Sequence, residues 1–237
     1  MKYLKVYGLH RTGTNYLFTL VCLNFKNINL FMNLGGFKHG NLIKFPKEED
    51  ILNKYLDIPT YLNYKDRVQT IKTLFEEEKV IFLVTVKNPY LWIISHIKFH
   101  GSEFCNKNIV RFSKQWSEKY REYAESIKDG TAHLVKYEDV LTSYDNFLDN
   151  LQKKYDLEKN HTEYVNIDKE ILPCKDSELG KHNIKKFFTK RDYYMNPDLE
   201  KIYTTEQISL INQNLDKKVM EFYNYRFYSL VFNNKLD

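Results

Sequence analysis

Two short stretches of the sequence contain residue types that bind phosphate groups. The first, GLHRTGTNYL at residues 8–17, has glycines at 8 and 13, the G-x-x-x-x-G spacing of a phosphate-binding loop. It lies between an apolar run and an apolar pattern with helical spacing, so N–H groups around Gly13 are expected at a helix N-terminus, where they bind anions. A nucleotide kinase would show Gly-Lys-Ser or Gly-Lys-Thr there, whereas this chain has Gly13, Thr14 and Asn15. Taken alone, the stretch is also compatible with an ordinary turn that binds nothing.

The second stretch, VTVKNPYLWIISHIKF, places Lys87 directly after a β-branched apolar run and Ser95 eight residues later. The run predicts a buried parallel strand over residues 79–86, and Asn88 with Pro89 predicts the start of a helix. Ligands of open α/β sheets bind beyond the carboxyl ends of the strands, where the glycine loop should also lie. We therefore expect both stretches to contribute to one anion-binding site.

The two stretches together resemble the PAPS-dependent sulfotransferases, whose donor is 3′-phosphoadenosine 5′-phosphosulfate (PAPS). That family has a Lys/Arg-Ser/Thr-Gly-Thr loop after its first strand, which residues 11–14 (RTGT) match. It also has Arg-Asp/Asn-Pro with a serine eight residues after the arginine, which residues 87–89 (KNP) and Ser95 match. The resemblance covers most of the chain and extends to the helix from 116 to 123, to KYED at 136–139 and to the terminal EFYNY, although only the first two motifs are diagnostic.

The resemblance implies one site for each charged end of the donor. The residues that it assigns to PAPS are Arg11, Thr12, Gly13, Thr14, Asn15, Lys87 and Ser95. The first five would bind the 5′-phosphosulfate, and the last two would bind the 3′-phosphate. A sulfuryl group is a monoanion that leaves a single phosphate, so fixed cations and N–H donors suffice, and we expect no metal requirement.

Lysine at position 87 departs from the arginine of the family. A lysine binds phosphate as a point charge, whereas an arginine offers two parallel donors, so the 3′-phosphate is bound more weakly or another cation assists. Candidates for such assistance lie in the basic stretch 181–194, which we expect to be a surface loop; they are Lys185, Lys186, Lys190 and Arg191. Each of the four can also be interpreted as a solvated surface charge.

A hydroxyl group that attacks sulfur needs a base to take its proton. Some members of the family use a histidine in a Lys-x-His context soon after the first helix, and Lys38 and His39 fall in that region as adjacent residues. We expect His39 to be the base and Lys38 to add positive charge; the alternatives are a plain surface histidine at 39 and His100 as the base. His96 and His100 have the i, i+4 spacing of a zinc pair, but no convincing third ligand accompanies them, and we predict no metal site.

Strands and helices alternate along the chain. We expect strands at 3–8, 79–86 and 132–137, and helices after Gly13, over 66–78, over 109–128, over 141–155 and from Thr204 to Phe222. Asp139 is expected to cap the helix after the third strand. The aromatic face of 109–128 is expected in the core. This order predicts one domain over residues 1–237, a three-layer α/β/α fold with a central, mostly parallel sheet like that of the P-loop NTPases.

Composition limits the classes of partner. The chain has 237 residues and a net charge of +5, which is too small for a nucleic-acid coat but suits anionic small ligands or acidic polymers. No apolar run approaches the ~20 residues that cross a bilayer, so we predict no membrane span. Three scattered cysteines, Cys22, Cys105 and Cys174, favour reduced thiols and a cytoplasmic protein.

The sequence thus predicts a sulfotransferase with a hydroxyl-bearing acceptor, a saccharide or another small molecule. Two other functions stay open at this point. One is a P-loop kinase of a small molecule or nucleotide, which the missing Gly-Lys-Ser/Thr disfavours. The other is a non-catalytic module that binds a nucleotide or a glycan. The acceptor and the oligomeric state are not readable from the sequence.

Overall fold

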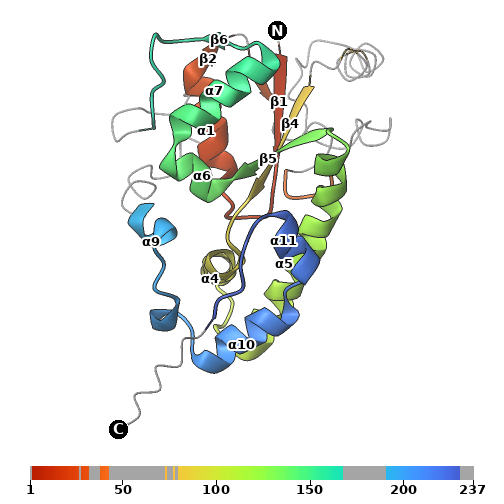
Figure 1. Ribbon diagram of the computed structural model, residues 1–237, viewed down its shortest axis with the longest axis vertical. Helices are drawn as coiled ribbons and strands as arrows, with labels where there is room; N and C mark the ends of the chain where they lie inside the picture. Colours follow the sequence, from red (N-terminus) through yellow and green to blue (C-terminus); the bar gives the residue numbers. More distant parts are fainter. Residues whose placement is uncertain are drawn as a thin grey trace.

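The computed structural model describes residues 2–26, 28–31, 38–42, 73, 77, 80–167 and 191–229. The helices and strands that position the site, with the labels of Figure 1, are β1 (Lys2–Tyr7), α1 (Thr14–Asn24), β2 (Phe25–Lys26), β3 (Ile28–Phe31), β4 (Val80–Val86), α4 (Pro89–His100), α5 (Asn106–Lys128), β5 (Ala132–Lys136), α6 (Tyr137–Thr142), α7 (Tyr144–Tyr155), β6 (Glu158–Lys159), α9 (Arg191–Met195), the 3₁₀ helix η2 (Leu199–Lys201), α10 (Thr205–Asn214) and α11 (Lys217–Phe222).

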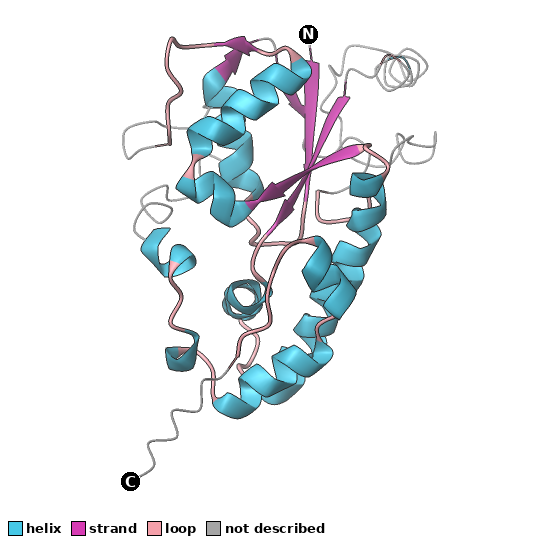
Figure 2. Ribbon diagram, in the orientation of Figure 1, coloured by secondary structure: helices cyan, strands magenta, loops and turns pink. Residues whose placement is uncertain are grey.

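The central sheet, whose strands are magenta in Figure 2, is parallel. Its strand order is β3-β1-β4-β5. Tyr7 of β1 is paired with Val84 of β4, and Val86 of β4 is paired with Lys136 of β5. Three segments therefore leave the same edge of the sheet side by side: the loop to α1, the turn to α4 and the start of α6. The chain goes from β1 to β3 on one side and reaches β4 on the other, and open α/β sheets bind their ligands at such a reversal.

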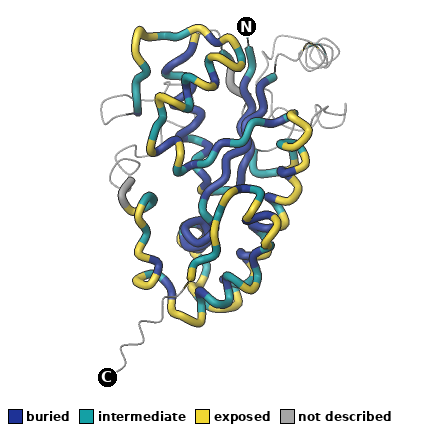
Figure 3. Tube along the Cα trace, in the orientation of Figure 1, coloured by how far each residue is buried: buried dark blue, intermediate teal, exposed yellow. Residues whose placement is uncertain are grey.

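Helices cover both faces of the sheet (Figure 1). α1, α6 and α7 share one buried core with the sheet, which includes Leu17, Val140 and Leu148. α4, α5, α10 and α11 share a second core, which includes Trp92 and Trp116. The strands and α4 form the buried centre of the tube in Figure 3, as a sheet covered on both faces requires. The predicted three-layer α/β/α class is thus confirmed, while the single domain over the whole chain stays a prediction.

Most of the predicted elements are confirmed within the described residues. Asn88 is the N-cap of α4, where its side chain accepts a hydrogen bond from the N–H of Tyr90. Thr204 and Gln207 form a capping box at the start of α10. The aromatic face of α5 lies in the core, with Phe112, Trp116, Tyr120 and Tyr123 all buried.

The helix predicted over 141–155 is instead two helices, α6 and α7, which meet at Ser143. The φ of Ser143 is −143°, which no α-helix accommodates. The prediction that Asp139 caps this region is wrong, because α6 begins at Tyr137 and its N-cap is Lys136. Asp139 lies in the first turn of α6, where a carboxylate interacts favourably with the helix dipole.

Other differences lie at the edges of the fold. The apolar run up to Phe222 divides into α10 and α11, because the side chain of Asp216 caps a new helix through the N–H of Val219. β3 and the antiparallel pair of β2 with β6 were not predicted. The helix predicted over 66–78 lies outside the described residues, apart from positions 73 and 77. In the part of the chain that the structure describes, no helix has both the length and the apolar character needed to cross a membrane.

Candidate active site

The loop between β1 and α1 is fixed by hydrogen bonds to its own backbone and to β4. The hydroxyl of Thr12 donates to the carbonyl oxygen of Leu9 at 2.7 Å and lies 2.9 Å from Oγ1 of Thr85. Oγ1 of Thr85 in turn donates to the carbonyl oxygen of Tyr7 at 3.1 Å. The N–H of Thr12 also donates to Leu9, at 3.3 Å. Buried Thr12 therefore fixes the course of the loop.

The two glycines of the loop leave no room for side chains. A Cβ on Gly8 would lie 2.2 Å from Oγ1 of Thr85 and 2.8 Å from the carbonyl oxygen of the same residue. A Cβ on Gly13 would lie 2.3 Å from Cδ2 of Tyr137, and Gly13 has a φ of +89°. Gly13 is the N-cap of α1, and no side chain caps this helix. The N–H groups of its first turn are therefore suited to an anion.

Arg11 is held in a strained conformation in the same loop. Its φ of +70° is in the left-handed region, which costs a residue other than glycine about 1–2 kcal/mol. The guanidinium carbon lies 5.1 Å from the ring centroid of Phe99 on α4, and the residue is exposed. Burial raises the pKa of Tyr137 and of Tyr194, and the charge of Arg11 opposes both shifts, so this cation lies near both phenols. Strain of this kind persists where the surrounding structure requires it, often at functional sites.

Lys38 and His39 lie directly against the loop. The carbonyl oxygen of Lys38 accepts the N–H of Gly8 at 3.0 Å, and Nζ of Lys38 donates to Oδ1 of Asn15 at 2.5 Å. Nδ1 of His39 lies 2.6 Å from the carbonyl oxygen of Gly8. Because a carbonyl only accepts, Nδ1 carries the proton and Nε2 carries the lone pair of the neutral ring. The segment predicted to hold the base is thus anchored to the loop between β1 and α1.

Burial lowers the pKa of His39 to about 3, with further lowering by the charges of His10 and Lys38. The hydrogen bond to Gly8 acts in the opposite direction. His39 is therefore neutral at physiological pH and can accept a proton. A bound anion nearby would raise this pKa, because negative charge favours the imidazolium.

Four histidines gather beside the loop. The ring of His10 lies 3.7 Å from that of His39 and 5.6 Å from that of His100, centroid to centroid. The ring of His96 lies 4.3 Å from that of His100, and burial lowers the pKa of His96 to about 4. Within the described ranges, no three or more His, Cys, Asp or Glu side chains are arranged to hold a metal ion. The rings contact one another face to edge or obliquely, as aromatic side chains do.

Lys87 lies at the carboxyl end of β4, one strand away from the loop. Its carbonyl oxygen accepts the indole N–H of Trp116 at 3.1 Å. Its side chain is 1% exposed, and the ammonium lies 3.9 Å from the ring centroid of Tyr194 and 5.4 Å from that of Tyr137. Ser95 lies on α4, and its side chain contacts the phenol of Tyr194. The predicted 3′-phosphate residues are therefore close together, under tyrosine rings that the sequence did not predict there.

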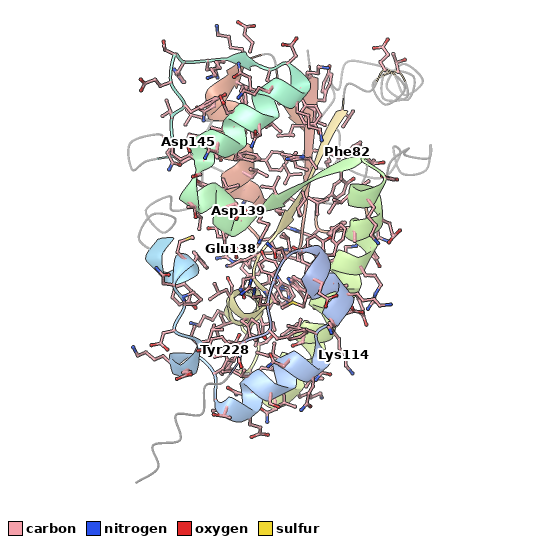
Figure 4. All side chains as sticks on the ribbon, in the orientation of Figure 1. Phe82, Lys114, Glu138, Asp139, Asp145 and Tyr228 are labelled. Carbon is pink, nitrogen blue, oxygen red and sulfur yellow. The ribbon has the colours of Figure 1, made fainter. Side chains whose placement is uncertain are left out.

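Glu138, labelled in Figure 4 near the start of α6, connects the KYED and EFYNY stretches to the Lys87 turn. Oε1 of Glu138 accepts the N–H of Asn88 at 2.8 Å, and Oε2 accepts the hydroxyl of Tyr225 at 2.8 Å. One carboxylate thus fixes the peptide that follows Lys87. The KYED and EFYNY stretches therefore meet at Glu138.

The structure places most of the predicted site residues around one edge of the sheet. Arg11, Gly13, Asn15, Lys38 and His39 surround the end of β1. Lys185, Lys186 and Lys190 lie outside the described residues, as does the side chain of Arg191, which begins α9. The stretch 181–194, predicted to be a loop, therefore ends in a helix.

Sequence reasoning missed His10, Phe99, Tyr137, Glu138 and Tyr194. Tyr137 and Glu138 directly follow β5, so the rule that carboxyl ends of parallel strands share an edge could have found them. Nothing in the spacing of the sequence points to Tyr194.

Comparisons with known proteins give few matches. No protein-family model matches the chain, and no curated protein does. Among solved structures, the chain is similar to the sulfotransferase domain of the olefin synthase from Synechococcus PCC 7002, with 11% identity and a TM-score of 0.43, over 90% of this chain and 93% of that one. At this level of similarity, any assignment of function depends on the site itself.

Proposed function

We propose that this chain is a sulfotransferase that moves the sulfuryl group of PAPS to a hydroxyl group of its acceptor. The observation that carries the proposal is the placement of two cations at adjacent strand ends, Arg11 after β1 and Lys87 after β4. Each has hydrogen-bond donors beside it, the first turn of α1 and the hydroxyl of Ser95. PAPS has a charged group at each end of its adenosine unit, and these two groups match the two cations.

At the 5′ end, the first turn of α1 would bind the phosphate through the N–H groups of Gly13, Thr14 and Asn15. Arg11 would contact the sulfuryl oxygens and the bridging oxygen, where negative charge grows as the sulfur–oxygen bond breaks. Lys38, which already bonds to the side chain of Asn15, adds a second positive charge at this end. PAPS, when bound, supplies the activated sulfuryl group.

At the 3′ end, Lys87 and Ser95 would bind the phosphate that distinguishes PAPS from donors without it. Lysine binds as a point charge, so its position matters more than the direction of its N–H bonds. Trp116 and Glu138 fix the two ends of the peptide between Lys87 and Asn88, and thereby the position of the lysine.

His39 would act as the base. Its Nε2 takes the proton of the acceptor hydroxyl while the acceptor oxygen bonds to sulfur. The electron pair of the broken sulfur–oxygen bond stays on the departing phosphate, so atoms and charges balance. The negative charge of the donor would raise the pKa of His39 from about 3 towards the range in which general bases work. The acceptor, a saccharide or another small hydroxyl compound, would approach beside the rings of His10 and Phe99.

A transfer assay with labelled PAPS and a panel of hydroxyl acceptors tests the proposal. We expect sulfation that continues unchanged in excess EDTA, because the charges that face the donor are protein groups. ATP with Mg²⁺ should not serve as donor. Phosphate transfer from ATP that stops in EDTA would instead establish a kinase. Binding of PAP, the desulfated product, without sulfation of any acceptor would favour a non-catalytic nucleotide-binding module.

A further inference from the structure

The ammonium group of Lys87 is covered by two tyrosine rings. The ring centroid of Tyr194 lies 3.9 Å from Nζ and that of Tyr137 lies 5.4 Å from it. The two rings contact each other edge to face, with 5.4 Å between centroids and 81° between planes. Only 1% of Lys87 is exposed. A phosphate group therefore reaches this cation only if a side chain that covers it moves.

The two rings differ in how firmly they are held. Tyr137 is buried at the junction of β5 and α6, where its ring blocks any side chain on Gly13. Tyr194 comes from α9, a helix of five residues beside α6 (Figure 1). Tyr194 is only partly buried, and the residue before it in α9, Tyr193, is 37% exposed. Of the two covers, Tyr194 is the one that can move without disturbing the sheet.

Tyr194 also occupies the place that a phosphate would need. Its ring faces Lys87, and its hydroxyl contacts the side chain of Ser95. A phosphate bound by both Lys87 and Ser95 has to lie between them. A cation–π contact is weaker than charge-assisted hydrogen bonds from ammonium and hydroxyl to a phosphate, so an arriving phosphate can replace the ring.

We propose that Tyr194 is an autoinhibitory cover that closes the Lys87 site until an anion of the correct shape displaces it. That the anion is the 3′-phosphate of PAPS rests on the proposed function. The cover itself rests on the contacts of Tyr194 with Lys87 and Tyr137. In this arrangement a ligand binds only the fraction of molecules in which the cover is open, so its apparent affinity is reduced by that fraction.

The accessibility of Lys87 tests the cover without any nucleotide. The rate at which a small amine-acetylating reagent modifies Lys87 is followed by peptide mass spectrometry in the parent, Tyr194→Ala, Tyr194→Phe and Tyr193→Ala. If the cover is open about one tenth of the time, Tyr194→Ala should increase the rate about tenfold. Tyr194→Phe keeps the ring, and Tyr193→Ala changes the neighbouring exposed ring, so both should stay near the parent rate. An unchanged rate in Tyr194→Ala overturns the proposal.

Titration of the same proteins with PAP then separates this proposal from the proposed function. We expect Tyr194→Ala to bind PAP up to about tenfold more tightly than the parent. Weaker binding by Tyr194→Ala would make Tyr194 a ligand of the phosphate and overturn the cover. Faster acetylation of Tyr194→Ala, with no PAP binding by any variant, would support the cover and reject PAPS as donor. PAP binding with equal affinity and equal acetylation in all variants would reject only the cover.

Discussion

The two strand ends that form the candidate site are built in different ways. After β1 the backbone has an unusual course, with two glycines at positions that exclude a Cβ and Arg11 at positive φ, and the cation is exposed. After β4 neither Lys87 nor Asn88 has a positive φ, and the cation Lys87 is buried under tyrosine rings. Trp116 and Glu138, from α5 and α6, hold the peptide that follows it.

Two charges at one edge of the sheet can therefore be restrained separately. The first charge depends on local backbone geometry, so one added methyl group should disturb it. The second depends on side chains from distant parts of the chain, so it should respond to the loss of single hydrogen bonds.

The largest effect should come from the exposed cation after β1. Arg11→Ala should lower turnover of PAPS about 10²–10³-fold, because a fixed charge at the developing negative charge is lost. The affinity for PAP, measured by calorimetry, should fall less than turnover does. Lys114→Ala removes an exposed cation of α5 and serves as the control with parent activity. Equal turnover in Arg11→Ala and the parent would remove Arg11 from the mechanism.

The backbone of the same loop should tolerate no side chain. Gly8→Ala should lower the free energy of unfolding by about 3 kcal/mol, because the new Cβ meets both the hydroxyl and the carbonyl oxygen of Thr85. Gly101→Ala is the matched control, since Gly101 has a φ of +61° but nothing within 4 Å of its Cβ position. The control should lose only about 1 kcal/mol. Urea denaturation measures both, and equal losses would show that the close contact with β4 is unimportant.

The buried cation after β4 should set the selectivity for the donor. Lys87→Met keeps the length of the side chain without the charge, and Ser95→Ala removes the hydroxyl. Each should reduce the preference for PAP over AMP by about 1.5–3 kcal/mol, the contribution of a hydrogen bond to a charged group. Calorimetric titration with both nucleotides measures this preference. Its survival in both variants would mean that the 3′-phosphate binds elsewhere.

The sequence predicted the first strand end better than the second. The glycine spacing and the strand-loop-helix order are local patterns, and they correctly placed the loop at the N-terminus of α1. The use of Thr12 inside the loop was missed, because it depends on contact with Thr85 on another strand. Lys87 and Ser95 were placed by their position after β4, again a local property.

The surroundings of Lys87 could not be predicted, because they come from residues far apart in the sequence. Tyr194 and Trp116 reach this turn from α9 and α5, and Tyr225 is connected to it through Glu138. Spacing within one stretch carries no information about such contacts. The break between α6 and α7 was missed for a different reason: the apolar positions on both sides of Ser143 continue one helical pattern.

A smaller effect should follow from loosening the peptide after Lys87. Glu138→Ala removes the acceptor of the Asn88 N–H and of the Tyr225 hydroxyl, so PAP affinity should fall by about 1 kcal/mol. Glu138→Gln keeps an oxygen that can accept the Asn88 N–H, and it should restore most of the affinity. The thermal unfolding temperature of both variants is measured alongside. Equal PAP affinity in the parent and Glu138→Ala would show that this carboxylate does not position Lys87.

The stability of the site region should also depend on pH through two buried histidines, His39 beside the loop and His96 on α4. Burial lowers the pKa of His39 to about 3 and that of His96 to about 4, from an ordinary value of 6.5. Between about pH 6.5 and about pH 4 the unfolded chain therefore binds protons that the folded chain does not, so the free energy of unfolding should fall as the pH is lowered through this range. Above it, these two groups should have no effect.

His96→Phe tests whether α4 contributes to this pH dependence of stability. The ring of His96 lies against those of Trp92 and Phe112, and within the described part of the chain its Nδ1 has no hydrogen-bond partner, so a phenyl ring suits the position. The variant has one fewer group that takes up a proton on unfolding. Its unfolding temperature should therefore decrease less than that of the parent between about pH 7 and about pH 5. The part of the decrease that remains would come from the other histidines whose pKa burial lowers, His39 and His10 at the loop and His133 on β5. Parallel curves for variant and parent would show that α4 contributes nothing to the pH dependence.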